Sequence, residues 1–203
     1  MDAKLILSPF LNEADYEALG SAVVTGYKAC DLFMASNTAM DNFIVGMEQR
    51  SRLISVFVDH ALTKIDSFNY EVKPNAANNC RHVRIYKEQL AITAHFLGRG
   101  KCPRKLPNKA INRAQLSERN MSLFPDDSEQ PDISSELGYC WLLHSGFVTP
   151  RETSLAIPTR DQSSVHAITS LPLVDVEYSA IEQVREEMTI ELISRTEQAE
   201  NEG

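Results

Sequence analysis

One short stretch of the chain combines residue types that could hold a metal ion. Glu71 and Lys73 are separated by one residue in a segment whose pattern predicts a strand. Their side chains would therefore lie on the same face of that strand. This pair could bind a divalent metal and polarise a phosphodiester, as in nucleases built on an E-x-K strand, with Asp66 or Asp59 as second metal ligand. The acidic strand that usually precedes such a site is missing, because Asp59 lies in a predicted helix. The alternative is a solvated strand edge that ends at Pro74.

The histidines and cysteines have no spacing typical of metal ligands. The five histidines are His60, His82, His95, His144 and His166, and four of them fall on predicted strands. Imidazoles on neighbouring strands could converge on zinc together with Cys140, but no pair has a suitable spacing within one element. We therefore interpret the histidines as polar-face or core residues, and we expect no metal and no cofactor. Cys140 lies in an apolar strand, so we expect it to be buried and unreactive.

Motifs for a nucleophile or for phosphate binding are incomplete. Ser145 follows a predicted strand and precedes a glycine, but position 143 is leucine and a turn follows, so the nucleophile elbow of hydrolases is not formed. The segment from Gly98 to Lys101 is only a fragment of a phosphate-binding glycine loop. The sequence therefore favours a protein that is not an enzyme.

A basic segment, 99–119, is the clearest candidate binding surface in the sequence. The segment contains a single acid, Glu118, and many cationic side chains. The cationic residues are Arg99, Lys101, Arg104, Lys105, Lys109, Arg113 and Arg119. They could contact the phosphates of a nucleic acid, although aromatic side chains for base stacking are scarce nearby. Alternatively, the segment docks on the acidic residues 125–136, on the acidic helix between Glu182 and Glu197, or on a second subunit. The net charge of −8 favours a protein partner over nucleic acid.

Helices are predicted at both ends of the chain. From Asn12, which can cap a helix, apolar residues recur at threes and fours, and the pattern resumes after residue 38 and continues to about Asp66. These two helices would form an antiparallel hairpin over 12–66 that covers a sheet face or meets a second copy of itself. A third, acidic and amphipathic helix is predicted over 179–198. Residues 5–11 fit either a short strand or a packed arm.

Alternation of apolar and polar residues predicts a sheet over 69–174, interrupted by a basic and acidic insertion at 98–136. The last part, 137–174, contains three short strands joined by turns. The strand around Trp141 is apolar on both faces, so it should be central in the sheet and covered on both sides.

Composition limits the class of protein. The chain has 203 residues, of which 43% are hydrophobic and 24% charged, values typical of a globular protein. No run approaches the roughly 20 apolar residues that span a bilayer, so no membrane association is expected. The four cysteines are scattered and the N-terminus has no signal peptide, which favours a reduced, cytoplasmic protein.

These observations predict a single α+β domain over 1–203, with a mainly antiparallel sheet, an N-terminal helical hairpin and a C-terminal amphipathic helix. The favoured function is a non-enzymatic interaction or regulatory protein that acts through charged surfaces as a homodimer. One alternative is a nucleic-acid-binding protein that uses segment 99–119. The other is a metal-dependent nuclease that uses Glu71, Lys73 and Asp66.

Overall fold

The computed structural model describes residues 2–37, 44–74, 81–98, 106–107, 116–117, 120 and 138–201. Its helices are α1 (Ala3–Leu7), α2 (Glu13–Ser36), α4 (Ile44–Leu62) and α6 (Tyr178–Asn201). Its strands are β1 (Asn69–Pro74), β2 (Arg81–Lys87), β3 (Leu90–Phe96), β4 (Gly138–Gly146), β5 (Pro150–Pro158) and β6 (Val165–Ser170). The predicted fold class, α+β with helices at both ends, is confirmed.

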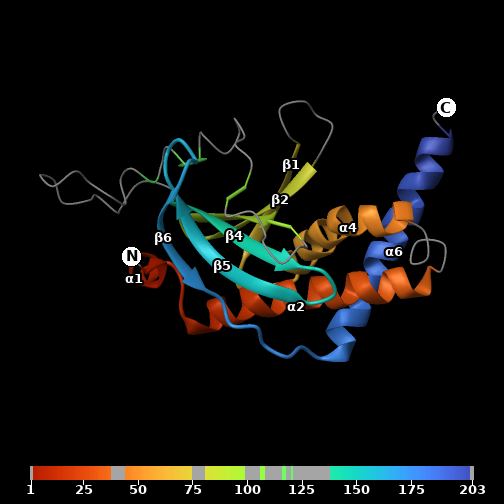
Figure 1. The fold of residues 1–203 in the computed structure, drawn as a ribbon, viewed down its shortest axis with the longest axis horizontal. Helices are drawn as coiled ribbons and strands as arrows, with labels where there is room; N and C mark the ends of the chain where they lie inside the picture. The colour runs from red at the N-terminus through yellow and green to blue at the C-terminus, as the bar shows by residue number, and fades with distance from the viewer. Residues whose placement is uncertain are drawn as a thin grey trace, which may run out of the picture.

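The six strands form one sheet in which the spatial order equals the chain order. Every neighbouring pair is antiparallel except β3 and β4, which run parallel. Figure 1 shows α2 running along one side of the sheet, with α1 near β6 and α6 at the end of the molecule away from α1. The strands β1 and β6 form the two edges of the sheet.

Helices α2 and α4 form the predicted N-terminal hairpin, and the connection 38–43 lies outside the described residues. The side chain of Asn12 accepts a hydrogen bond from the Asp15 N–H, and the Asp15 carboxylate accepts one from the Asn12 N–H, so a capping box starts α2. At Gly26, α2 and α4 cross so closely that a Cβ there would lie 2.6 Å from the Cα of Val58. The second helix ends at Leu62, four residues before the predicted end, because tighter backbone hydrogen bonds follow, such as Thr63 N–H to His60 O at 3.0 Å.

Two hydrophobic clusters cover the two faces of the sheet. The larger lies between the sheet and the helices and includes Tyr27, Phe57, Leu142 and Ile181. The smaller lies on the other face, around the fully buried Trp141. Its members are Ala91, Leu97, Leu116, Tyr139, Trp141, Leu143 and Ala156. All nine residues of β4 are buried, which confirms the prediction of a central strand covered on both sides.

A buried ion pair joins α2 to the hairpin of β2 and β3. The Asp15 carboxylate is nearly inaccessible, and both of its oxygens lie 2.6 Å from Lys87 Nζ. The Ser67 hydroxyl donates a third hydrogen bond to Asp15 at 3.1 Å. These contacts fix the start of β1, and therefore the sheet edge, relative to the helices. Within the described ranges, no helix is both long enough and apolar enough to cross a membrane.

Candidate interaction groove

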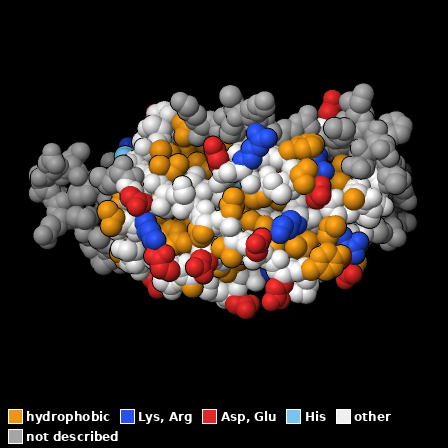
Figure 2. All heavy atoms as spheres, turned by 60° about the horizontal axis from the view of Figure 1, so that its bottom comes forward, with side chains coloured by type: hydrophobic (Ala, Val, Ile, Leu, Met, Phe, Trp, Pro, Cys, Tyr) orange, Lys and Arg blue, Asp and Glu red, His pale blue; other side chains and the backbone are white. Residues whose placement is uncertain are grey.

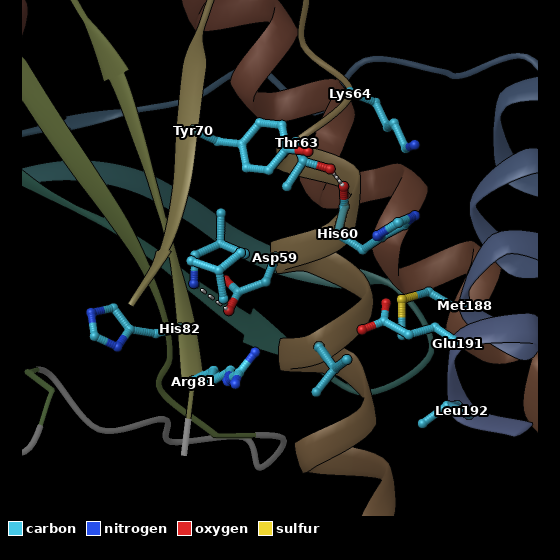
Figure 3. A pocket seen from close by; sticks show the side chains of 13 residues that line it. Asp59, His60, Thr63, Lys64, Tyr70, Arg81, His82, Met188, Glu191 and Leu192 are labelled. Atoms are coloured by element: carbon cyan, nitrogen blue, oxygen red, sulfur yellow. Dashed lines mark hydrogen bonds between the residues drawn. The ribbon is translucent and has the colours of Figure 1, made fainter. Parts of the chain in front are cut away.

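A groove of about 660 Å³ lies where α4, the β1–β2 edge of the sheet and α6 meet. We call it the edge groove; Figure 3 shows side chains from all three parts of the fold around it. Its apolar lining residues are Val56, Tyr70, Val72, Val83, Met188 and Leu192. Lys64 lies at one end of the groove and Arg81 at the other (Figure 3), with Asp59 between them.

Three of the apolar lining residues lie close together and are exposed to solvent. The exposed fractions are 55% for Tyr70, 47% for Val72 and 43% for Val56. Tyr70 and Val72 alternate along β1, so their side chains leave the strand on the same face. Because β1 is an edge strand, no further strand among the described residues pairs with its outer edge. Clustered exposed apolar side chains of this kind mark surfaces that bind another molecule.

Asp59 is the titratable group on the floor of the edge groove. It projects from α4 toward β2, where its Oδ2 accepts a hydrogen bond of 3.5 Å from the Val83 N–H (Figure 3). Burial among the groove walls raises the pKa of this carboxyl to about 7, and the Val83 hydrogen bond only partly opposes that effect. Near neutral pH the floor of the groove therefore carries a carboxyl that is only partly ionised.

The wall between α4 and α6 is held by a charged cluster centred on Glu187. Its carboxylate accepts a hydrogen bond from Lys64, one from Gln183 at 3.0 Å, and one of 2.8 Å from His60 Nε2. Mainly because of the Lys64 contact, the pKa of Glu187 falls to about 2. The cluster fixes the position of α6, on which the groove residues Met188 and Leu192 lie.

The edge groove presents apolar, hydroxyl, imidazole, acidic and basic side chains together. It has apolar walls, a carboxyl on its floor and basic side chains at its ends, but no serine or cysteine among its lining residues. Among the residues described by the structure, no group of three or more His, Cys, Asp or Glu side chains is arranged to hold a metal ion. The arrangement can accommodate an apolar segment and form hydrogen bonds with polar groups beside it.

The predicted pair Glu71 and Lys73 lies on β1, on the face opposite Tyr70 and Val72. The two side chains share a face, as predicted, and form an ion pair of 3.0 Å. Glu71 also accepts hydrogen bonds from Arg84 at 3.2 Å and from the Tyr86 hydroxyl, both on β2. No described contact joins Asp66, which is exposed after α4, to this cluster. The nuclease hypothesis stays a prediction that Glu71→Ala and a cleavage assay with Mg²⁺ or Mn²⁺ would test.

The basic side chains of the predicted segment 99–119 lie outside the described residues, as does the acidic segment 125–136. On α6, by contrast, several acids have partners within the protein. Glu187 belongs to the cluster described above, and Glu182 lies 2.7 Å from Arg185. Figure 2 shows acidic, basic and hydrophobic side chains interspersed on one face of the molecule, so no single charge sign dominates that face.

The predicted zinc candidates are distributed over the molecule. His60 and His82 line the edge groove. His95 lies 2.7 Å from the Thr93 hydroxyl on the face of Trp141, while His144 is buried beneath the helices with its Nδ1 3.1 Å from the Tyr27 hydroxyl. His166 is exposed on β6. Cys140 is fully buried, as predicted, and burial raises the pKa of its thiol.

Sequence patterns did not indicate the edge groove as a site. Its walls come from three segments, near Asp59, Val72 and Met188, whose proximity depends on the tertiary fold. One signal was present: Tyr70 and Val72 alternate with charged Glu71 and Lys73 in a short segment, which gives the strand one apolar and one charged face. Comparisons with protein-family models, with curated proteins and with solved structures found no match to this chain.

Proposed function

We propose that this chain is a non-enzymatic interaction protein of the cytoplasm that binds protein segments, including its own, through the edge groove. The observation that carries the proposal is the exposure of Val56, Tyr70 and Val72 in one groove beside an open sheet edge. A partner segment lying there would cover these apolar side chains and gain the free energy of their burial, about 25 cal/mol per Å² of apolar surface.

The backbone of β1 supports the same proposal. An edge strand presents unpaired N–H and C=O groups, and an extended segment can add to it as a further strand. The opposite edge is less open, because Asp2 forms a parallel bridge with Ile168 on β6. Specificity would come from side chains that enter the groove beside Asp59 and from contacts with the basic side chains at its ends.

Photocrosslinking in the native cell tests the proposal. p-Benzoylphenylalanine at Tyr70 is expected to give covalent adducts with protein, either a second copy of this chain or another protein. The matched control places the same amino acid at Leu5 on α1, which is also exposed (76%) but lies by β6. Protein adducts that are absent at position 70, or equally abundant at both positions, would overturn the proposal.

A further inference from the structure

The sequence of β1 is self-complementary around Val72. We propose that a second copy of this chain occupies the open edge, with the two β1 strands antiparallel and Val72 directly opposite the partner's Val72. This inference rests on the proposed function and names the occupant of that site. The resulting dimer has a two-fold axis at Val72, so the same surface of each copy forms the interface.

Regular geometry of β1 makes it a suitable template for such pairing. All six of its residues, Asn69 to Pro74, pair with β2 in continuous register, without a bulge that would twist the edge away. Pro74, which has no N–H, stands at the end of the strand, so the donors of the preceding residues are retained. Charged side chains on an edge strand can also oppose pairing, but both charges of β1, Glu71 and Lys73, have a place in the pairing proposed here.

Charge pairing selects the register. When Val72 faces its own copy, Glu71 lies opposite the partner's Lys73, and Lys73 lies opposite the partner's Glu71. Directly opposed unlike charges stabilise an antiparallel pair, and like charges destabilise it. Moving the centre by one residue would place Glu71 opposite the partner's Glu71, or Lys73 opposite the partner's Lys73. Of these three registers, only the one centred on Val72 opposes unlike charges.

The side chains of Glu71 and Lys73 are positioned for this exchange. Arg84 and Tyr86 hold Glu71 from the β2 side of the strand. Lys73 contacts Glu71 within the same chain at 3.0 Å, and its side chain is half exposed at 49%. A lysine of this exposure can turn from its own Glu71 to the partner's Glu71 without breaking a buried contact.

The apolar face of β1 fits the same register. Opposite residues in an antiparallel pair have side chains on the same face of the sheet. Tyr70 would therefore lie over the partner's Pro74, and the two Val72 side chains would meet at the axis. The exposed apolar side chains of the two edge grooves would then form one continuous strip across the interface, and both helical layers would lie on the same side of a joined sheet.

Disulfide crosslinking tests the register directly. Opposite Cα atoms in antiparallel strands are about 4.5–5.5 Å apart, within the range of a disulfide. In a full-length background with Cys80 and Cys102 replaced by serine, Val72→Cys is expected to form a covalent dimer under mild oxidation. Tyr70→Cys is the control, since its two copies would lie four residues apart, about 14 Å along the strands. A monomer from Val72→Cys, or equal crosslinking at both positions, would overturn the proposal.

Charge reversal provides a second test that does not depend on a cysteine. Glu71→Lys and Lys73→Glu would each create like-charge pairs and raise the dimer dissociation constant at least about tenfold in sedimentation experiments. In a 1:1 mixture of the two variants, each lysine again lies opposite a glutamate, so the mixture is expected to give a heterodimer. The double variant E71K/K73E should again form a homodimer. Circular dichroism checks that each variant folds, and dimers of unchanged affinity in the folded single variants would contradict the proposal.

The two proposals can fail separately. Adducts from position 70 that contain another protein but never a second copy would leave the proposed function standing and overturn the self-pairing. Absence of protein adducts at position 70 would overturn both.

Discussion

The Asp59 carboxyl lies on the floor of the edge groove, where burial raises its pKa to about 7 from an ordinary value of 3.8. Between these two pH values the folded protein keeps a proton on Asp59 that the unfolded chain has released. The contribution of this group to stability is therefore complete below about pH 4 and is lost as the pH rises through 7. The same ionisation places a negative charge beneath any segment bound in the groove.

Asp59→Asn should remove this pH dependence, because the amide oxygen can still accept the Val83 hydrogen bond but does not ionise. We expect the variant to gain about 1–2 kcal/mol relative to wild type at pH 8, and little at pH 4. Urea denaturation at a series of pH values measures the difference. Asp66→Asn, at an exposed position after α4, is the matched control. A constant difference between pH 4 and pH 8 would contradict the assignment.

His144 has the opposite pH dependence. It is fully buried, and burial lowers its pKa to about 3, so the folded protein holds the neutral imidazole. Below pH 6.5 the unfolded chain takes up a proton that folded His144 does not accept. The stability that depends on neutral His144 is therefore present at pH 7 and falls as the pH decreases toward 3.

His144→Gln retains a hydrogen-bonding group for the Tyr27 hydroxyl but cannot be protonated in this range. Between pH 7 and pH 4.5 wild type should lose about 2 kcal/mol more stability than the variant does. The free energy of unfolding, measured at both pH values, gives this comparison. His166→Gln, at an exposed position on β6, controls for the loss of a histidine and should follow wild type.

At residue scale, the sequence predicted that Glu71 and Lys73 lie near each other on one strand, but not which other side chains contact them. The one-residue spacing correctly put both side chains on one face, because a strand has a period of two. It could not indicate that Arg84 and Tyr86 would reach Glu71, since those contacts depend on the register of β1 against β2. The same is true of Asp59, whose surroundings come from β2 and α6.

At the scale of elements, the contact between α2 and α4 depends on Gly26. A Cβ at this position would lie 2.6 Å from the Cα and 2.7 Å from the N of Val58, both backbone atoms that cannot rotate away. Gly26→Ala must therefore move the helices apart. We expect a net loss of about 1–2 kcal/mol, because the overpacking cost exceeds the gain in helix propensity.

Chemical denaturation followed by circular dichroism measures the effect of Gly26→Ala. The control is Glu17→Ala, which introduces the same side chain at an exposed position of α2 and should change stability by less than about 0.5 kcal/mol. An alanine at position 26 that leaves stability unchanged or increases it would contradict the close crossing.

Elements that depend on local pattern were predictable, and their long-range pairing was not. The stripe Ile181, Val184 and Met188 indicated α6, and all three side chains are buried. The parallel pairing of β3 with β4 had no local signal, because it depends on how the connection 97–137 returns the chain to the sheet. The edge groove is likewise a product of this assembly.

For the whole molecule, β4 links the two hydrophobic clusters. Cys140 and Leu142 belong to the cluster beneath the helices, while Trp141 and Leu143 belong to the cluster on the other face. Loss of this strand would open both clusters at once. The two layers of the protein should therefore unfold together rather than in sequence.

Two probes can test this cooperativity, because Trp141 is the only tryptophan in the chain and it reports on the face away from the helices. Its fluorescence and the helical circular dichroism signal should give the same unfolding midpoint in urea. Gly26→Ala alters the helical layer, whereas Leu143→Ala removes buried volume from the other cluster and should cost about 2–5 kcal/mol. Each variant should shift both signals equally, since β4 transmits the loss between faces. A variant that shifts one signal without the other would show that the two layers unfold independently.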